Sequence, residues 1–389
     1  MMRKIIGYAA FFVLLAAGAG WWWTSSRAEA APATASLLAP AGPIDQTGFA
    51  RATEPDNIQF PADLGPHDDY QTEWWYYTGN LESADGRRFG YQFTIFRRAF
   101  APEEATPPEA ASDWRTNQLY FAHFTISDID GEAFYPAEKF SRGAVGLAGA
   151  EAEPYRVWIE DWEAAANASG QVELTAATDE VALNLTLTET MPPILHGDGG
   201  LSVKGPGSGN ASYYYSLVQM AAEGTVTIGG EQFSVSGLSW KDHEYSTSAL
   251  EDGAVGWDWF SLQLDDGAAL MFFQIRLADG SLSNFSSGSY IRPDGSVQPL
   301  AADDWSLTVL AEWTSPHSGA VYPAGWRIEI PSLDLTLEGT PLLADQELNV
   351  STIYWEGATE FSGARAGRPI SALGYVELTG YAQSMQGRI

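Results

Sequence analysis

The chain has 389 residues, of which 45% are hydrophobic and 13% aromatic, and it contains no cysteine. This apolar content lies outside the range of disordered chains, and the length exceeds one ordinary core, so we expect two domains. The formal net charge of −30 disfavours nucleic acid as a partner, because phosphate binding needs clustered Lys and Arg. The missing cysteine excludes thiol catalysis and disulfides.

The first 30 residues have the pattern of an export signal. Two basic residues precede an apolar run from Ile5 to Gly20, and residues 28–30 form an A-x-A cleavage pattern. Trp21-Trp22-Trp23 lengthens the apolar run towards a membrane span, so an uncleaved anchor is the alternative. We expect a periplasmic or secreted protein, possible membrane tethering through this segment, and a flexible linker over residues 31–55.

Residues 71–97 predict a β-hairpin, since an aromatic, β-prone segment and an alternating segment flank the turn signal Asp85-Gly86. Val181 to Thr188 also alternates apolar and polar residues, as a strand with one buried face does. Further strand patterns follow over residues 119–127, 155–159, 172–175, 213–220, 225–228, 233–240, 256–264, 269–276, 285–291, 305–310, 326–330, 333–338, 352–357 and 374–381. With almost no helical periodicity, the chain is predicted to be all-β, built as barrels or sandwiches.

The two halves of the chain contain a weak internal sequence repeat. An aromatic strand, an Asp-Gly turn and a strand ending in arginine occur between Trp75 and Arg97, and again between Trp257 and Arg276. Two related β-domains would explain this repeat. We place them at residues 56–245 and 246–389, and we interpret both arginines as structural salt-bridge partners.

Residues 239–248 and 256–260 concentrate ionisable and aromatic side chains. On a strand, Asp242 and Glu244 point to one face while His243 and Tyr245 point to the other. Asp258, from the next strand, is predicted to meet His243 as an acid–base pair. The alternative interpretation is a fully hydrogen-bonded polar network that holds two strands together.

Other candidate residues surround this stretch. Glu73 is interpreted either as a second cavity carboxylate or as an acid at a sheet edge, and His123 is expected to face the lumen of the first barrel. The predicted ligand-binding set is Trp240, Tyr245, Trp257, Trp259, Glu73, Trp75, Tyr77 and His123. The chain has no H-E-x-x-H, no G-x-S-x-G and no nucleotide-binding loop, which argues against a zinc site, an α/β-hydrolase and a nucleotide cofactor.

Several motifs together resemble the AttH-like/CrtC family, which includes carotenoid 1,2-hydratases. The resemblance spans residues 56–389 and is carried by Tyr70 to Leu81, Ala122-His123-Phe124, Trp240 to Ser248, Gly256 to Trp259, Tyr354 to Gly357 and Gly374 to Tyr381. It implies two lipocalin-like (calycin-type) antiparallel β-barrel domains, and hydration of an isoprenoid double bond without a cofactor or metal.

By resemblance, Asp258 is expected to donate the proton and His243 to orient or deprotonate water, with Asp242 as a third catalytic candidate. Trp240, Trp257 and Tyr245 are expected to form the wall that stabilises the cation. Tyr245 departs from the family pattern, since the hydratases tend to have tryptophan there. Two functions stay open: a hydratase acting on an apolar isoprenoid or carotenoid-like alkene, and a non-catalytic lipocalin-like carrier of a small hydrophobic molecule in the cell envelope.

Overall fold

The computed structural model describes residues 45–102, 112–247 and 250–386, all of which belong to one compact unit, Ala41–Ile389. Its regular structure is antiparallel β-sheet, with short 3₁₀ turns at η1 (Ala62–Leu64), η3 (Ala302–Asp304) and η4 (Pro331–Leu333). The predicted export segment and the start of the linker lie outside the described residues. Among the described residues, no helix has the length and apolarity needed to cross a membrane.

The first sheet has the strand order β4-β3-β2-β1-β13-β12-β9-β8-β7-β6-β5, with β10 and β11 added to β12. Its strands are β1 (Thr72–Ser83), β2 (Arg88–Ala99), β3 (Gln118–Asp128), β4 (Ala133–Arg142), β5 (Ala148–Ala152), β6 (Tyr155–Ile159), β7 (Trp162–Ala166), β8 (Val172–Ala177), β9 (Val181–Glu189), β10 (Ile194–Leu195), β11 (Leu201–Val203), β12 (Ala211–Ile228) and β13 (Glu231–Ser246). The sheet is curled, as shown by contacts of β2, β3 and β4 with β6, which lies near the opposite end of the strand order.

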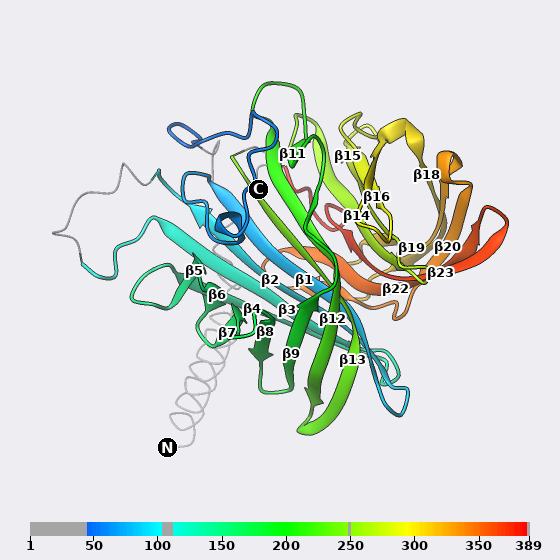
Figure 1. Cartoon of the computed structure of the whole chain (residues 1–389), viewed down its shortest axis with the longest axis horizontal. Helices are drawn as coiled ribbons and strands as arrows, with labels where there is room; N and C mark the ends of the chain where they lie inside the picture. The colour runs from blue at the N-terminus through cyan, green and yellow to red at the C-terminus, as the bar shows by residue number, and fades with distance from the viewer. Residues whose placement is uncertain (1–44, 103–111, 248–249, 387–389) are drawn as a thin grey trace, which may run out of the picture. The chain divides into compact units, whose positions relative to one another are not determined.

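The second sheet has the order β17-β16-β15-β14-β23-β22-β20-β19-β18, with β21 paired to β22. Its strands are β14 (Ala254–Leu264), β15 (Ala269–Leu277), β16 (Ser287–Ile291), β17 (Val297–Ala301), β18 (Ser306–Thr314), β19 (Val321–Ile330), β20 (Leu335–Pro341), β21 (Glu347–Asn349), β22 (Ile353–Arg365) and β23 (Arg368–Leu378). Figure 1 shows both sheets curled, the first in blue to green and the second in yellow-green to red. The predicted all-β fold of two lipocalin-like barrels is confirmed, whereas the domain boundary at residue 245 stays a prediction.

The described residues form four apolar clusters, of which a small one, with Tyr213, Tyr215 and Tyr245, lies beside His243. Alternation along the strands creates the three larger ones. One fills the first barrel and includes Trp75 and Tyr77, and a second fills the second barrel and includes Phe260. The third lies where β1 and β2 contact β23 and β22, and we call it the inter-sheet layer. Its apolar part includes Tyr76, Tyr214, Trp240, Trp259, Ala358 and Tyr375. Each strand at this junction therefore offers one face to a barrel interior and the other to the layer.

The predicted first hairpin is confirmed, with β1 and β2 paired antiparallel and Gly86 at a φ of 88° in the turn. Only glycine adopts that left-handed conformation without strain. The structure adds strands that the sequence patterns missed, namely β4, β5, β7, β10, β11, β17 and β21.

Candidate functional site

His243 lies fully buried on the inner face of the first sheet, beside Trp75, whose ring it overlaps at a centroid distance of 4.9 Å. Its Nε2 is 2.8 Å from Glu73 Oε1, and its Nδ1 is 2.9 Å from the hydroxyl of Tyr215. Burial lowers the pKa of His243 to about 4, so the ring is neutral at pH 7. An ionised Glu73 only accepts hydrogen bonds, so Nε2 carries the proton and Nδ1 accepts from Tyr215.

Glu73 is the centre of this network. Burial alone would raise its pKa, but the Arg97 charge and hydrogen bonds from two imidazoles hold it well below its usual range. Arg97 Nε donates to Glu73 Oε2 at 2.8 Å, and His67 Nδ1 lies 2.7 Å from Oε1. Burial opposes protonation of His67, yet hydrogen bonds to Asp63 and Glu73 raise its pKa to about 9. The carboxylate of Glu73 is therefore neutralised by two cations, Arg97 and the loop residue His67.

Tyr245, a predicted cavity wall, packs against this network rather than against an open space. Its ring stacks on His67 with centroids 3.5 Å apart and planes 8° from parallel. Tyr77 also lies inside the first barrel, where its hydroxyl is 2.7 Å from that of Tyr155. The surroundings of His243 thus match the alternative interpretation of a hydrogen-bonded network that joins strands.

The group His67, Glu73 and His243 also has the residue types of a metal site, with ligand atoms that all lie within 4.8 Å of one another. The Arg97 guanidinium, however, already neutralises Glu73 at 2.8 Å, and it would repel a divalent cation beside it. Each ring nitrogen of the two histidines also has a protein hydrogen-bond partner. The residues fit a charge-paired network better than a metal centre.

The predicted pairing of His243 with Asp258 is wrong. Asp258 accepts from Arg276 Nε at 2.9 Å and from Gln274 Nε2 at 2.6 Å, and the hydroxyl of Tyr381 lies 3.1 Å away. It shares a face of β14 with the second-barrel residue Phe260.

The physical reason is the topology: the chain turns from the first sheet to the second between these residues, and alternation directs them into different barrels. The predicted salt bridges of Arg97 and Arg276 are confirmed, to Glu73 and Asp258.

His123 also differs from its expected place. Its strand neighbours Ala122 and Phe124 belong to the cluster inside the first barrel, so alternation turns His123 away from the lumen. Its Nδ1 instead lies 2.7 Å from the hydroxyl of Tyr354 on β22. The expectation of a lumen-facing His123 is therefore wrong, and this residue bridges the two sheets.

Asp242, the residue before His243, faces the inter-sheet layer, as the alternation predicted. Its carboxyl accepts from Trp240 Nε1 and from the Tyr214 hydroxyl, both at 2.6 Å, and from the hydroxyl of Ser216. Trp259 Nε1 donates in turn to the hydroxyl of Tyr214, at 3.1 Å. Burial raises the pKa of Asp242 to about 7, despite these three donors.

Two further carboxyls reach the layer from the second sheet. Glu377 on β23 accepts from Trp257 Nε1 at 2.6 Å, and Glu356 on β22 accepts from the Tyr76 hydroxyl at 2.6 Å. Burial raises the pKa of Glu377 to about 7, and repulsion by Asp242 adds to it. Burial and repulsion by Glu377 raise the pKa of Glu356 well above its usual range.

None of these three carboxyls forms an ion pair with a residue in the described ranges. They therefore form a group of acids, two of them buried and Glu377 partly buried, that hold protons near pH 7 among indole and phenol rings. Such a group can supply a proton and take one back without a charged partner.

The sequence had assigned Asp242, Trp240, Trp257 and Trp259 to a site, and the structure brings these four to one layer. The sequence analysis did not identify four other residues of this layer: Tyr76, Tyr214, Glu356 and Glu377. The motifs that contain Glu356 and Glu377 were visible, but nothing in them shows that β22 and β23 face β1 and β13.

A family model described as AttH-like matches residues 51–381. The chain belongs to the AttH-like family. This AttH-like protein is 35% identical to an AttH-type protein of Nitrosomonas europaea with a crystal structure, which it matches with a TM-score of 0.76 over 86% of this chain and 100% of that one.

More distant relatives have named activities. The crystal structure of kievitone hydratase from Nectria haematococca is 14% identical, with a TM-score of 0.63 over 86% of this chain and 98% of that one; this shows a shared fold. The dehydratase asqC of Emericella nidulans is 22% identical over 212 residues, 51% of this chain and 58% of that protein. The AttH-like chain thus spans little more than half the length of this curated relative.

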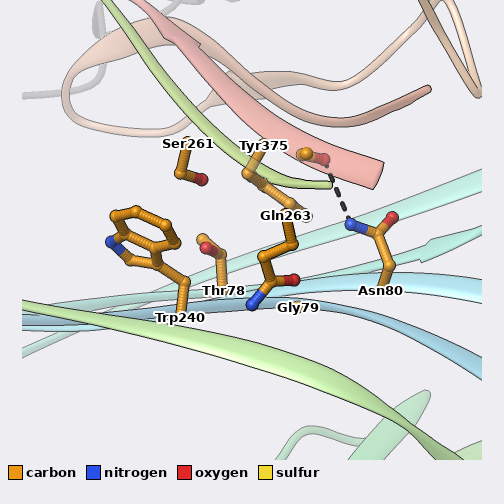
Figure 2. A pocket seen from close by; sticks show the side chains of 8 residues that line it. Thr78, Gly79, Asn80, Trp240, Ser261, Gln263 and Tyr375 are labelled. Carbon is orange, nitrogen blue, oxygen red and sulfur yellow. Dashed lines mark hydrogen bonds between the residues drawn. The ribbon is translucent and has the colours of Figure 1, made fainter. Parts of the chain in front are cut away.

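A small cavity lies in the inter-sheet layer of the AttH-like protein, beside Trp240. Figure 2 shows Thr78, Asn80 and Trp240 of the first sheet with Ser261, Gln263 and Tyr375 of the second around it. Its volume is about 10 Å³, which is about the space for one water molecule. A larger ligand therefore requires side chains of the layer to move.

Proposed function

We propose that this AttH-like protein adds water to, or removes water from, an apolar alkene or alcohol in the inter-sheet layer, without a cofactor. The observation that carries this function is the pair of acids formed by the buried Asp242 and the partly buried Glu377, whose pKa values desolvation raises to about 7. At that pH each acid is available both as a proton donor and as a base. The hydratase and dehydratase names of two relatives support the same reaction class.

In the proposed reaction one carboxyl, in its acid form, gives its proton to an alkene carbon, and the adjacent carbon becomes a carbocation. The faces of Trp240, Trp257 and Trp259 stabilise that cation. Water then forms a C–O bond to it and loses a proton to the other carboxylate, so the two acids end with exchanged protonation states. The same steps in reverse remove water from an alcohol.

The substrate of this reaction is proposed to be an isoprenoid alkene of the kind that carotenoid hydratases take. The layer that would hold it is rich in aromatic side chains and contains no cation paired with its three acids among the described residues. Geraniol, which has a terminal isoprenoid double bond, is a suitable probe.

A non-catalytic carrier is the second candidate, favoured by the fully paired network around His243. Incubation of geraniol in ¹⁸O-labelled water separates the two. A hydratase yields a tertiary alcohol carrying one labelled oxygen, whereas a carrier binds geraniol and leaves it unchanged.

Variants test the residues. Asp242→Asn and Glu377→Gln are each expected to lower the hydration rate about 100-fold or more, and Glu360→Gln, an exposed acid on β22, is the matched control. Because one acid must be neutral and the other ionised, the rate should peak near pH 7 and fall on both sides. Wild-type rates in both variants would exclude this function.

We also propose that residues 1–30 direct export to the periplasm or the medium. Mass spectrometry of the mature N-terminus in cell fractions tests this. A chain that starts at Ala31 outside the cytoplasm is the expected result, a membrane-bound chain with Met1 would indicate an anchor, and a soluble cytosolic chain with Met1 would contradict export.

A further inference from the structure

Five buried side chains of the inter-sheet layer have an oxygen with no hydrogen-bond partner among the described residues. They come from both sheets and are Asn80 Oδ1, Gln92 Oε1, Thr125 Oγ1, Glu356 Oε2 and the Tyr375 hydroxyl. Buried polar atoms are nearly always paired in folded proteins, so a cluster of exceptions needs a cause. Each of these five residues is at least nine-tenths buried, and the remaining unpaired atoms are scattered elsewhere.

Hydrogen bonds and strand pairing show which side of each group is free, and two of the five residues, Asn80 and Tyr375, line the cavity beside Trp240. Asn80 Nδ2 donates to the carbonyl of Gly374 on β23 at 3.1 Å, which fixes the amide and leaves Oδ1 as a free acceptor. Gln92 Nε2 donates to Thr94 and, at 3.3 Å, to the hydroxyl of Tyr354 on β22, which again leaves only its oxygen free.

Tyr375 completes the set from the second sheet. Burial raises the pKa of the Tyr375 hydroxyl, and the nearby hydroxyls of Thr125 and Ser127 act to lower it. Ser127, however, donates to Gln346 Oε1 at 2.7 Å, and Tyr375 has no well-formed hydrogen bond among the described residues. Asn80 and Tyr375 both line the cavity beside Trp240, which Figure 2 shows between the two sheets.

The free atoms select a kind of ligand. Two are amide oxygens, which only accept, two are hydroxyls, which accept or donate, and the fifth is a carboxyl oxygen of Glu356. A bound hydrocarbon would exclude water from these polar atoms and leave them all unpaired, which would weaken its binding. A carboxylate would meet two acceptor oxygens beside three acids, and Lys204, which lies over the Tyr214 and Phe273 rings of the layer, is already paired with Glu244.

We propose that the ligand of the inter-sheet layer carries a neutral hydroxyl group, as an alcohol or phenol, that donates to Asn80 Oδ1 and accepts from Tyr375. The apolar remainder lies along Trp240 towards Asp242 and Glu377. That the protein also converts this ligand rests on the proposed function, but the test of the inference measures binding alone. It narrows the substrate from any isoprenoid alkene to an oxygenated one.

Four ten-carbon probes with one skeleton and different head groups test the inference: geraniol, the hydrocarbon myrcene, geranic acid and geranylamine. Binding is followed by quenching of tryptophan fluorescence at pH 7. Geraniol is expected to bind at least about tenfold more tightly than each of the others, as one good hydrogen bond allows. A purely apolar cavity would instead prefer myrcene, since the hydroxyl is costly to desolvate.

Tyr375→Phe is the decisive variant, because it removes only a hydroxyl, and that hydroxyl has no well-formed hydrogen bond within the part of the chain that the structure describes. We expect an unchanged melting temperature together with loss of most of the preference for geraniol over myrcene. Tyr322→Phe is the matched control, since it removes a hydroxyl bonded to Glu347 at 2.9 Å inside the second barrel. It should melt at a lower temperature and keep the preference.

Any of four results would overturn the inference: equal or tighter binding of myrcene, tighter binding of the acid or the amine, no binding of geraniol, or an unchanged preference in Tyr375→Phe. A crystal structure with geraniol present that shows only ordered water on Asn80 Oδ1 would do so as well. If geraniol binds as expected while Asp242→Asn keeps full activity, the proposed function fails and this inference stands.

Discussion

Substitution of Glu73 by glutamine tests how the first barrel is held together. Glu73→Gln preserves the shape of the side chain but removes the charge that pairs with the buried Arg97 Nε at 2.8 Å, and leaves Arg97 with the more distant Asp68, 3.6 Å from Nη1. It also replaces an acceptor oxygen by an NH₂ group, which cannot accept from either imidazole. The variant therefore leaves a buried guanidinium and a protonated His67 without their shared anion.

The magnitude follows from the burial of both partners. Removing one member of a fully buried ion pair costs about 3–5 kcal/mol, and each kcal/mol lowers the melting temperature of a domain of this size by about 2–4 °C. Calorimetry at pH 7 should thus show a decrease of about 6–20 °C. The control Glu360→Gln breaks an exposed pair with Arg88 at 3.5 Å, which is worth at most about 1 kcal/mol.

The pH dependence gives a second, independent check. The pKa of Glu73 in the folded chain lies well below its ordinary value, so its stabilising effect is complete above the unfolded pKa of about 4.3 and is lost as the pH falls towards the folded pKa. The difference between wild type and Glu73→Gln should narrow below about pH 4. A variant that melts with the wild type at pH 7, or a pH-independent difference, would refute this account of the network.

Two other substitutions have clear expected outcomes. Lys241 is buried, contacts the Tyr155 ring at 4.4 Å and has a pKa that burial lowers to about 7, so Lys241→Met should stabilise the chain by about 1–4 kcal/mol at pH 7. This gain in stability should shrink towards pH 10, where the unfolded lysine also loses its proton. Denaturant unfolding at pH 7 and pH 10 measures the gain. A variant less stable than the wild type at pH 7 would contradict this prediction. Asp258→Asn should lower the melting temperature by several degrees, because Arg276 loses its partner, but geraniol hydration per folded molecule should stay within about twofold. A loss of activity equal to that of Asp242→Asn would restore Asp258 as a catalytic candidate.

The features that the sequence predicted correctly are those that local geometry determines. The period of two in a strand separates Asp242 from His243, and the structure has the same separation. The Asp85-Gly86 turn likewise specifies the first hairpin without help from distant residues. The barrel fold follows from the number and spacing of strands, together with the family resemblance.

The partners of His243 could not be predicted in this way, because they depend on strand pairing between distant segments. Glu73 lies 170 residues before His243 in the chain, yet it accepts from its ring. Asp258 is close in sequence but belongs to the other sheet. His67 has the sequence context of a turn residue, and it enters the network because Arg97 Nη2 binds its backbone oxygen at 2.7 Å.

The contrast between the two polar clusters explains why the inter-sheet layer is the better place for proton transfer. In the first barrel Glu73 stays ionised and is balanced by Arg97 and His67, so this network does not change its protonation state readily near pH 7. Lys241 lies in the same barrel and has a pKa of about 7, but it offers a single amine rather than a pair of acids. In the layer, Asp242 and Glu377 form no ion pair within the described residues and hold their protons with pKa values of about 7. The two sheets share no strand pairing, and hydrogen bonds that cross the layer, such as Tyr76 to Glu356 and Asn80 to Gly374, involve side chains. We therefore expect a substrate to reach these acids by displacing side chains of the layer, whereas access to His243 would disrupt the core of the first barrel.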